Sequence, residues 1–145
     1  MECSLEGVCP LILMPGSIAM ANPAKGYESY MVPTLFGPCA RILIQAAEPK
    51  PGERVLDVGC GTGIVAREVA SRLRATGAIT AVDLSANMLA VARAAAAREG
   101  LAIEWREGNA EQLPFHDRAF DLVVSQFALM FVLTRQPPSR KCAGW

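Results

Sequence analysis

Short apolar runs and longer amphipathic stretches take turns along the chain between residues 38 and 125. Apolar runs of about five residues bounded by turn residues are typical of buried strands, whereas apolar residues at three- and four-residue spacing are typical of helices. In chain order the pattern predicts the helix Pro38–Ala47, the strand Arg54–Val58, the helix Ile64–Arg74, the strand Ala78–Val82, the helix Ala86–Arg98, a strand through Leu101, Ile103 and Trp105, and the strand Phe120–Ser125. Strands that alternate with helices indicate right-handed crossovers. We therefore expect an α/β fold in which helices cover both faces of a parallel sheet.

Local residue types fix several boundaries within this pattern. Ser85 is expected to cap the last of these helices, and Gly100 is expected to end it. In the preceding helix, Glu68 and Arg72 stand four residues apart, a spacing that favours an ion pair on an exposed face. Before the first helix, an aromatic segment is expected to be interrupted at Pro33, because proline removes a backbone donor.

Composition indicates a globular chain of one domain. It has 145 residues, of which 52% are hydrophobic and 19% charged, so it can bury a core. Lys plus Arg and Asp plus Glu both number 14, and the formal net charge is therefore zero. We expect no nucleic-acid partner, because neutralising phosphates takes an excess of cations.

Cysteine usage and an N-terminal apolar run bear on the cellular compartment. The five cysteines include no CxxC spacing, which argues against a zinc site and against a disulfide framework. The apolar run Val8–Met14 is too short to span a bilayer and contains Pro10. We expect a cytoplasmic protein without a metal site or a membrane span.

A glycine-rich turn joins the first predicted strand to the helix that follows. The sequence VLDVGCGTG runs from Val55 to Gly63. Glycines at such a turn let the backbone bend tightly and let a ligand approach it closely. Asp83 ends the next predicted strand, where a carboxylate can accept hydrogen bonds from both hydroxyls of a ribose. These features indicate a ligand that contains a nucleoside.

A nicotinamide dinucleotide is one alternative, because the spacing from Gly61 to Ala66 formally satisfies the dinucleotide fingerprint. Three features argue against it. Asp57 lies two residues before the first glycine of the turn, and the glycines are spaced one residue more tightly than a pyrophosphate loop requires. A second polar cluster, Gly108–Phe115, follows the third strand, where a dinucleotide needs none.

The sequence resembles the class I S-adenosylmethionine-dependent methyltransferases, in particular the group similar to ubiquinone/menaquinone-biosynthesis enzymes. The resemblance covers Tyr27 to about Val132 and implies a Rossmann-like fold. Four motifs carry it in the family's order: VLDVGCGTG at Val55–Gly63, AVDLSANML at Ala81–Leu89, GNAEQLPF at Gly108–Phe115 and FDLVVSQFAL at Phe120–Leu129.

The resemblance also implies which residues hold the cofactor, S-adenosylmethionine. Its methionine half is expected along the glycine loop, with Asp57 orienting the loop or binding the ammonium group, and Asp83 is expected to hold the ribose. Adenine is expected between an apolar wall, Leu84 and Met88, and the second polar cluster, while Gln126 approaches the sulfonium. The implied cofactor-binding set is Asp57, Gly59, Gly61, Thr62, Gly63, Asp83, Leu84, Met88, Asn109, Ala110 and Gln126. No catalytic base is assigned.

Several conspicuous residues have simpler interpretations. His116 is expected in an exposed loop, Asp121 is expected to brace the start of its strand, and Cys60 is expected to fill a small space. Tyr27 and Tyr30 could belong to a lid over the cofactor or could simply dock on the sheet, and the sequence leaves both open.

We divide the chain into three segments. Residues 1–24 form an irregular extension in which Met20 is a candidate start, residues 25–132 form the cofactor-binding domain, and residues 133–145 form a basic, aperiodic tail. The family's sheet has seven strands in the order 3-2-1-4-5-7-6, of which this chain supplies 3-2-1-4, so we expect a truncated domain. Read one nucleotide upstream, the tail's codons fit the family-like run D-P-x-A-A-I-x-E-M-x-R-V. We therefore interpret the tail as out of frame, which resequencing the coding DNA tests.

Three functions are compatible with these features. The first is methyl transfer from S-adenosylmethionine to a small-molecule acceptor, with an activity that the truncation could impair. The second is a non-catalytic cofactor-binding fragment that associates with itself through the bare edge of the fourth strand. The third is an NAD-dependent oxidoreductase.

Overall fold

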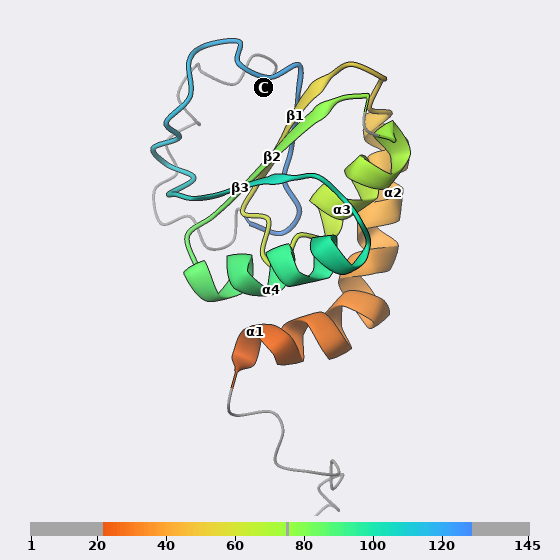
Figure 1. Ribbon diagram of the computed structural model, residues 1–145, viewed down its shortest axis with the longest axis vertical. Helices are drawn as coiled ribbons and strands as arrows, with labels where there is room; N and C mark the ends of the chain where they lie inside the picture. The colour runs from red at the N-terminus through yellow and green to blue at the C-terminus, as the bar shows by residue number, and fades with distance from the viewer. Residues whose placement is uncertain (1–21, 75, 129–145) are drawn as a thin grey trace, which may run out of the picture.

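A computed structural model describes residues 22–74 and 76–128. Its centre is a four-stranded sheet in the order β3-β2-β1-β4, in which all neighbouring strands are parallel (Figure 1). The strands are β1 (Arg54–Val58), β2 (Ala78–Asp83), β3 (Glu104–Glu107) and β4 (Leu122–Val124). The α/β class and the strand order expected from the sequence are confirmed.

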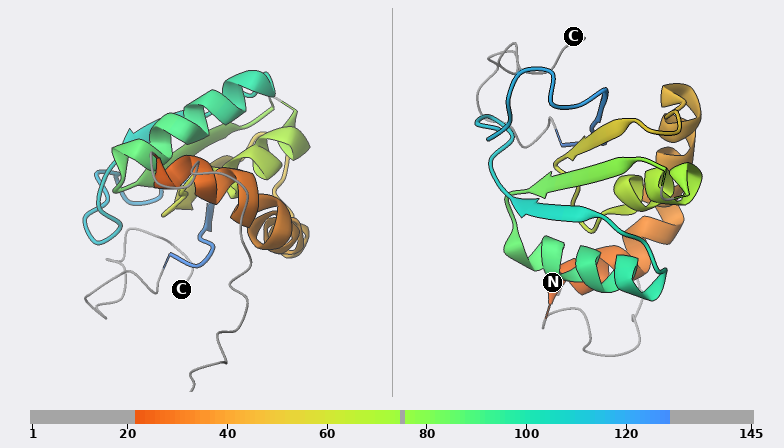
Figure 2. Two further views of the ribbon diagram at one scale, coloured as in Figure 1. Left: turned by 90° about the horizontal axis from the view of Figure 1, so that it is seen from below. Right: turned by 45° about the horizontal axis from the view of Figure 1, so that its top comes forward.

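Helices precede β1 and connect β1 to β2 and β2 to β3. The elements α1 (Pro23–Gly26), η1 (Tyr27–Phe36, a π-helix) and α2 (Gly37–Ala47) follow one another without a break. The crossover helices are α3 (Ile64–Leu73) and α4 (Ala86–Arg98). Two views from other directions show the α1–η1 stretch lying beside α4 (Figure 2).

The main apolar cluster lies on one face of the sheet. In the parallel register Val55 pairs with both Ile79 and Leu122, and these three side chains belong to one apolar cluster. Helices α2, α3 and α4 add to the same cluster, whereas Leu56, the strand neighbour of Val55, points to the opposite face. Within the described residues, the helices expected on both faces are therefore found on one. None of these helices is long and apolar enough to cross a membrane.

The third strand begins later than predicted. Leu101 and Ile103 are partly buried against the core, as the alternation implied, but β3 starts at Glu104. The reason is the end of α4: Gly100 adopts a φ of +68°, and the Leu101 N–H donates to the Ala96 carbonyl at 3.0 Å. This bond completes the helix terminus and keeps Leu101 out of the strand. The predicted cap is confirmed, since the Ser85 hydroxyl accepts from the Met88 N–H.

Two other local predictions are wrong. Pro33 does not interrupt its segment, since the π-helix η1 continues through it from Tyr27 to Phe36. Glu68 and Arg72 do not pair with each other. Each turns to α2 instead: Glu68 lies 3.8 Å from the Arg41 guanidinium, and Arg72 donates to the Ile44 carbonyl at 2.6 Å.

Candidate ligand-binding site

A cavity of about 760 Å³ opens at the carboxyl ends of the strands. That edge of an open parallel sheet is where ligands bind in this fold class, at the point where the strand order reverses between β1 and β4. Its volume is within the range of small-molecule sites. The predicted residues that line it are Gly59, Gly61, Asp83, Leu84, Met88, Asn109, Ala110 and Gln126.

The glycine loop is tied to the end of β2 by its own amides. Gly59 and Cys60 both donate their N–H groups to the Val82 carbonyl, at 2.8 and 3.0 Å. The Gly63 N–H donates to the Cys60 carbonyl at 2.8 Å. The Gly61 N–H donates to Asp83. These four amides are already used within the protein, so the loop is a poor cradle for an anion that needs free donors.

Asp83 connects two of the sequence motifs. One carboxylate oxygen accepts from the Gly61 N–H at 2.7 Å, and the other accepts from the Ser85 N–H at 2.8 Å. Asp83 is partly exposed and lines the cavity. Because each carboxylate oxygen has a second lone pair, both can accept a further hydrogen bond from a ligand. The two backbone bonds fix the direction in which the carboxylate is presented.

Asp57 does not line the cavity and instead braces the start of α3. It is 1% exposed, and one of its oxygens accepts from the Ala66 N–H at 3.1 Å, an amide of the first helical turn. Its other oxygen has no hydrogen-bond partner. Burial raises the pKa of Asp57 to about 7, a shift that the Ala66 bond opposes and the charge of Asp83 increases.

The loop glycines take backbone angles that favour glycine, and each meets a different neighbour. Gly59, Gly61 and Gly63 have φ values of +68°, +56° and +82°. A Cβ on Gly63 would come within 2.4 Å of the Trp105 ring, whereas one on Gly61 would lie 4.0 Å from the Tyr27 hydroxyl. Gly63 therefore makes room for packing behind the loop and does not line the cavity, while Gly61 faces the cavity beside Tyr27.

Thr62 and Cys60 also point away from the cavity. Thr62 is 1% exposed, and its buried hydroxyl has no partner. Cys60 belongs to the core cluster, as its predicted role of small filler implies, and burial raises the pKa of its thiol. Of the four loop residues expected at the ligand, the structure brings only Gly59 and Gly61 to the cavity.

The second polar cluster lies across the cavity from the loop. The Asn109 side-chain oxygen accepts from the Glu111 N–H at 2.9 Å, which shapes a tight turn after β3. Leu84 is 71% exposed at the cavity, so an apolar surface there lacks a protein neighbour. Asn109 and Leu84 thus present an acceptor and an apolar face to the same space.

Gln126 and three aromatic rings form the wall beside β4. The Gln126 amide nitrogen donates to the Phe36 carbonyl at 3.0 Å, and its buried oxygen has no partner. The rings of Tyr27 and Phe36 are stacked at 4.8 Å, and Phe127 meets Phe36 edge-on at 5.6 Å. Phe127 has a φ of +57°, which is uncommon for a bulky residue and marks a constrained position at the cavity.

The sequence interpretation missed part of this lining. Leu35 and Phe36 come from η1, far from the four motifs, and nothing in their local pattern marked them. Gly108 and Phe127 stand inside quoted motifs, directly after β3 and near the end of β4, and their position beyond a strand end was a usable signal. Tyr27 lines the cavity, as the lid interpretation requires, but its position alone does not test a lid function.

Two residues excluded from the site lie where the sequence indicated. The Asp121 carboxylate accepts from the Arg54 N–H at 2.9 Å and pairs with the Arg54 guanidinium at 2.8 Å, so it braces the starts of β4 and β1. His116 is exposed in a loop. Both predictions are confirmed.

Comparison with known proteins identifies relatives of this chain. A family model described as a methyltransferase domain matches residues 55–142. An uncharacterized protein of Mycobacterium tuberculosis is 38% identical over 114 residues, which cover 78% of this chain and 40% of that protein. A ubiquinone/menaquinone biosynthesis C-methyltransferase of Xylella fastidiosa is 38% identical over 103 residues, which cover 70% of this chain and 41% of that protein.

A solved structure is also similar. It is the crystal structure of a candidate S-adenosyl-L-methionine-dependent methyltransferase from Methanococcus maripaludis, with a TM-score of 0.64 and 26% identity. The match covers 75% of this chain and 51% of that one.

The extent of these matches bears on the segments expected from the sequence. The chain spans 40% to 41% of the length of these two curated relatives. The family match runs to residue 142, past the domain boundary expected at residue 132. Residues 133–145 lie outside the described part of the chain, and their out-of-frame interpretation stays a prediction.

Proposed function

Because the chain belongs to the methyltransferase domain family, we propose that it binds S-adenosylmethionine in the cavity and transfers the methyl group to a small-molecule acceptor. The observation that carries this proposal is the placement of Asp83. Its carboxylate lines the cavity while bonded to the glycine loop and to the cap of α4, so two sequence motifs meet at one acceptor. An acceptor at the end of the second strand suits the two hydroxyls of a ribose.

The donors and acceptors around the loop fit this cofactor better than a dinucleotide. A pyrophosphate needs free amide donors, and the amides of Gly59, Cys60 and Gly61 already donate within the protein. S-adenosylmethionine instead brings an ammonium and a sulfonium, both cationic. The carboxylate of Asp83, which lines the cavity, favours cations over phosphates.

We assign the remaining roles in the same way. Leu84 and Met88 provide the apolar face for adenine, and Asn109 and Ala110 provide polar contacts at its edge. The methionine half lies along Gly59 and Gly61. Thr62 and Gly63 do not contact the cofactor but set the shape of the loop from its buried side. Asp57 holds the end of the loop through its bond to the first turn of α3. Gln126 offers its unpaired oxygen beside the reacting end.

The cofactor, when bound, supplies a methyl group already activated by the positive sulfur. The protein's share is therefore to align the acceptor and to exclude water. Alignment of this kind can supply roughly 7–11 kcal/mol of a reaction barrier. The stacked rings of Tyr27 and Phe36, with Phe127 against them, give the cavity an apolar wall that serves both purposes. Transfer to an acceptor that carries a hydrogen also releases a proton, and we assign no side chain as the base that takes it.

Transfer of a labelled methyl group tests the activity. The purified chain is incubated with methyl-labelled S-adenosylmethionine and a small-molecule extract, and labelled products are separated and counted. We expect product with the wild-type chain and none with Asp83→Ala. A folded chain that binds the cofactor but yields no product would instead support a non-catalytic cofactor-binding protein.

The remaining expectations stay predictions. They are a cytoplasmic location, the lack of a nucleic-acid partner, and self-association through β4. In the described part of the chain β4 pairs with β1 alone, so its other side is an edge of the described sheet. Sedimentation of the purified chain at increasing concentration tests the last of these.

A further inference from the structure

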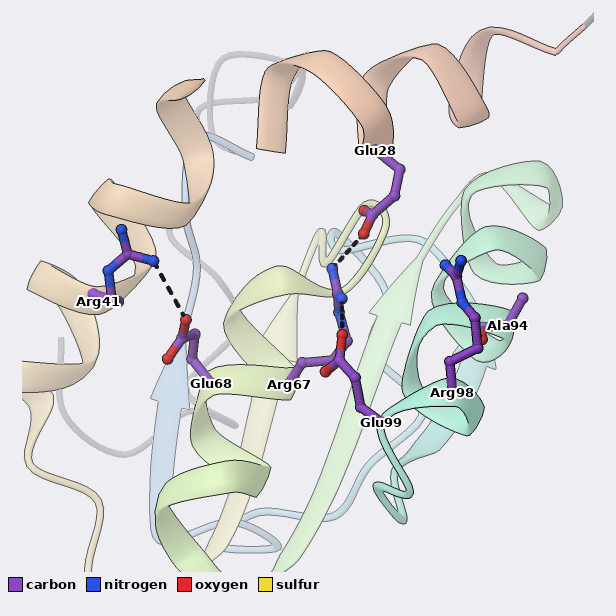
Figure 3. A network of polar contacts seen from close by, with 7 residues as sticks. All are labelled: Glu28, Arg41, Arg67, Glu68, Ala94, Arg98 and Glu99. Carbon is purple, nitrogen blue, oxygen red and sulfur yellow. Dashed lines mark hydrogen bonds and ion pairs between the residues drawn. The ribbon is translucent and has the colours of Figure 1, made fainter. Parts of the chain in front are cut away.

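An ion triad centred on the buried Arg67 joins the N-terminal helical stretch to the rest of the molecule (Figure 3). Arg67 of α3 has a side chain that is 7% exposed, and its guanidinium pairs with two carboxylates. One is Glu28 of η1, at 2.7 Å, and the other is Glu99, which follows α4. Three elements that are distant in sequence therefore meet at one cation.

The triad connects the two sides of the cavity. Arg67 sits one helical turn beyond the glycine loop, and its N–H donates to the Gly63 carbonyl at 2.9 Å. Its partner Glu28 is the next residue after Tyr27, whose ring lies beside Gly61 at the cavity. Arg67 thus fixes the distance between the helix that leaves the loop and the segment that faces the loop.

Apolar packing of this segment is thin. In α1 and η1 the buried residues are Ala24 and Val32. Tyr30, Met31 and Leu35 are instead exposed by 62%, 42% and 45% of their surface. So little buried apolar surface leaves polar contacts to decide how the segment docks.

The triad is also poorly suited to serve stability alone. Arg67 Nε and one oxygen of Glu28 are buried without partners. Buried ion pairs often contribute less than apolar residues of the same size, and their best-attested use is to fix one arrangement among several. The segment is also held by the hydrogen bond from the Gln126 side chain to the Phe36 carbonyl. This bond fixes the orientation of η1 without burying apolar surface.

We propose that Arg67 is a positioning residue for the cofactor site: through Glu28 it holds η1 against α3 so that Tyr27 and Phe36 form a wall of the cavity. The proposal rests on the proposed function for the identity of the ligand. Arg67 does not line the cavity and acts through the segment that it holds.

Two matched variants test this role. Glu28→Gln and Glu99→Gln each remove one carboxylate from the same arginine, but only Glu28 belongs to the segment that lines the cavity. Affinity for S-adenosylhomocysteine is measured by calorimetry, and hydrogen exchange is followed over residues 27–36. We expect Glu28→Gln to weaken binding by about tenfold and to speed exchange there, because the fraction of chains with a complete cavity falls. Glu99→Gln should leave both close to wild type.

A spectroscopic readout separates positioning from a general loss of stability. In a Tyr30→Phe background Tyr27 is the chain's sole tyrosine. Burial raises the pKa of Tyr27, with the charges of Asp83 and Glu28 adding to the shift. Release of η1 should lower the titration midpoint of its absorbance toward the ordinary value of about 10. Because Glu28→Gln removes one of these charges by itself, the titration uses Arg67→Gln, which breaks the same ion pair but retains Glu28. The midpoint should fall in Arg67→Gln and stay raised in Glu99→Gln.

Equal effects of the two variants, or a folded Glu28→Gln chain with unchanged affinity and exchange, would overturn the proposal. If Glu28→Gln does not fold, Glu28→Met replaces it, since methionine has a similar length and buries no polar group. Failure of both to fold would show that the triad is needed for the fold, which also overturns a positioning role. Absence of binding by the wild-type chain contradicts the proposed function alone, because exchange and the Tyr27 titration still test the docking of η1.

Discussion

The two walls of the cavity are built in different ways. The glycine loop between β1 and α3 is held by its own backbone amides, which bond to the end of β2, and Asp57 bonds to the first turn of the helix that the loop opens. The wall formed by η1 is held instead by side-chain contacts, namely Glu28 with Arg67 and Gln126 with the Phe36 carbonyl. The glycine loop is therefore continuous with the core, whereas η1 is attached to the core by a few side-chain contacts.

The two walls therefore differ in whether ligand binding can be changed without unfolding the protein. A change in the loop disturbs both the ligand and the packing behind it, because Gly63 lies against Trp105. A substitution at the contacts that hold η1 is expected to weaken ligand binding while the α/β core stays folded.

The largest effect is expected for Gly63→Ala. Its φ of +82° strains any residue with a Cβ, and that Cβ would come within 2.4 Å of the Trp105 ring. Left-handed strain of about 1–2 kcal/mol and overpacking of about 1–3 kcal/mol together remove much of a small domain's stability. Urea unfolding followed by circular dichroism measures the loss.

Gly100→Ala is the matched control for Gly63→Ala. Gly100 also has a positive φ, +68°, but no atom lies within 4 Å of its Cβ position. It should lose only the strain contribution, about 1–2 kcal/mol. Equal losses for the two variants would show that the space filled by Trp105 does not restrict the loop.

A second effect concerns Asp57 and pH. The unfolded chain releases the Asp57 proton near pH 4, whereas the folded chain keeps it until about pH 7. Between these values the folded state binds more protons, so the free energy of unfolding falls as pH rises, by up to about 1.4 kcal/mol per pH unit. Below pH 4 and well above pH 7 this contribution no longer changes.

Asp57→Asn isolates that contribution. Asparagine retains an oxygen that can accept from Ala66 but does not titrate. Urea unfolding at a series of pH values from 4 to 8 should show a decline for the wild-type chain that is absent in the variant. Parallel curves for the two proteins would mean that Asp57 is ionised throughout and that its burial is overcome by another group.

The smallest effect is expected at the exposed pair of Arg54 and Asp121. Its hydrogen bonds to Arg54 lower the pKa of Asp121 to about 2, so the pair is complete above pH 4 and is lost as pH falls through 2. Solvent and salt screen such a pair. Asp121→Asn should therefore change stability at pH 7 much less than Gly63→Ala, and less still at high salt. A loss as large as that of Gly63→Ala would show that the starts of β1 and β4 depend on this pair.

The same contrast explains what could be predicted from the sequence. The strands, the crossover helices and the acid at the end of β2 follow from local pattern, and α4 begins and ends at the predicted residues Ala86 and Arg98. Asp83 could be placed because parallel strands bring their carboxyl ends to one edge. Leu101 was wrongly assigned to the third strand. Its alternating pattern does not show that its N–H donates to the Ala96 carbonyl at the end of α4.

Residues fixed by distant partners could not be predicted. Glu28 and Arg67 are 39 positions apart, and nothing near either one indicates the other. The Glu68–Arg72 spacing suggested a local pair, but both side chains have partners in α2. Gly63 and Thr62 stand in a ligand-binding motif yet do not line the cavity, and only the packing of Gly63 against Trp105 and the burial of Thr62 reveal this.

Calorimetric titration of the purified chain with S-adenosylhomocysteine, with NADH in parallel and Asp83→Asn as control, tests the central claim most directly. We expect one-to-one binding of S-adenosylhomocysteine, no measurable binding of NADH, and a large loss of affinity in Asp83→Asn. Binding of NADH in place of S-adenosylhomocysteine, or undiminished binding by Asp83→Asn, would contradict it.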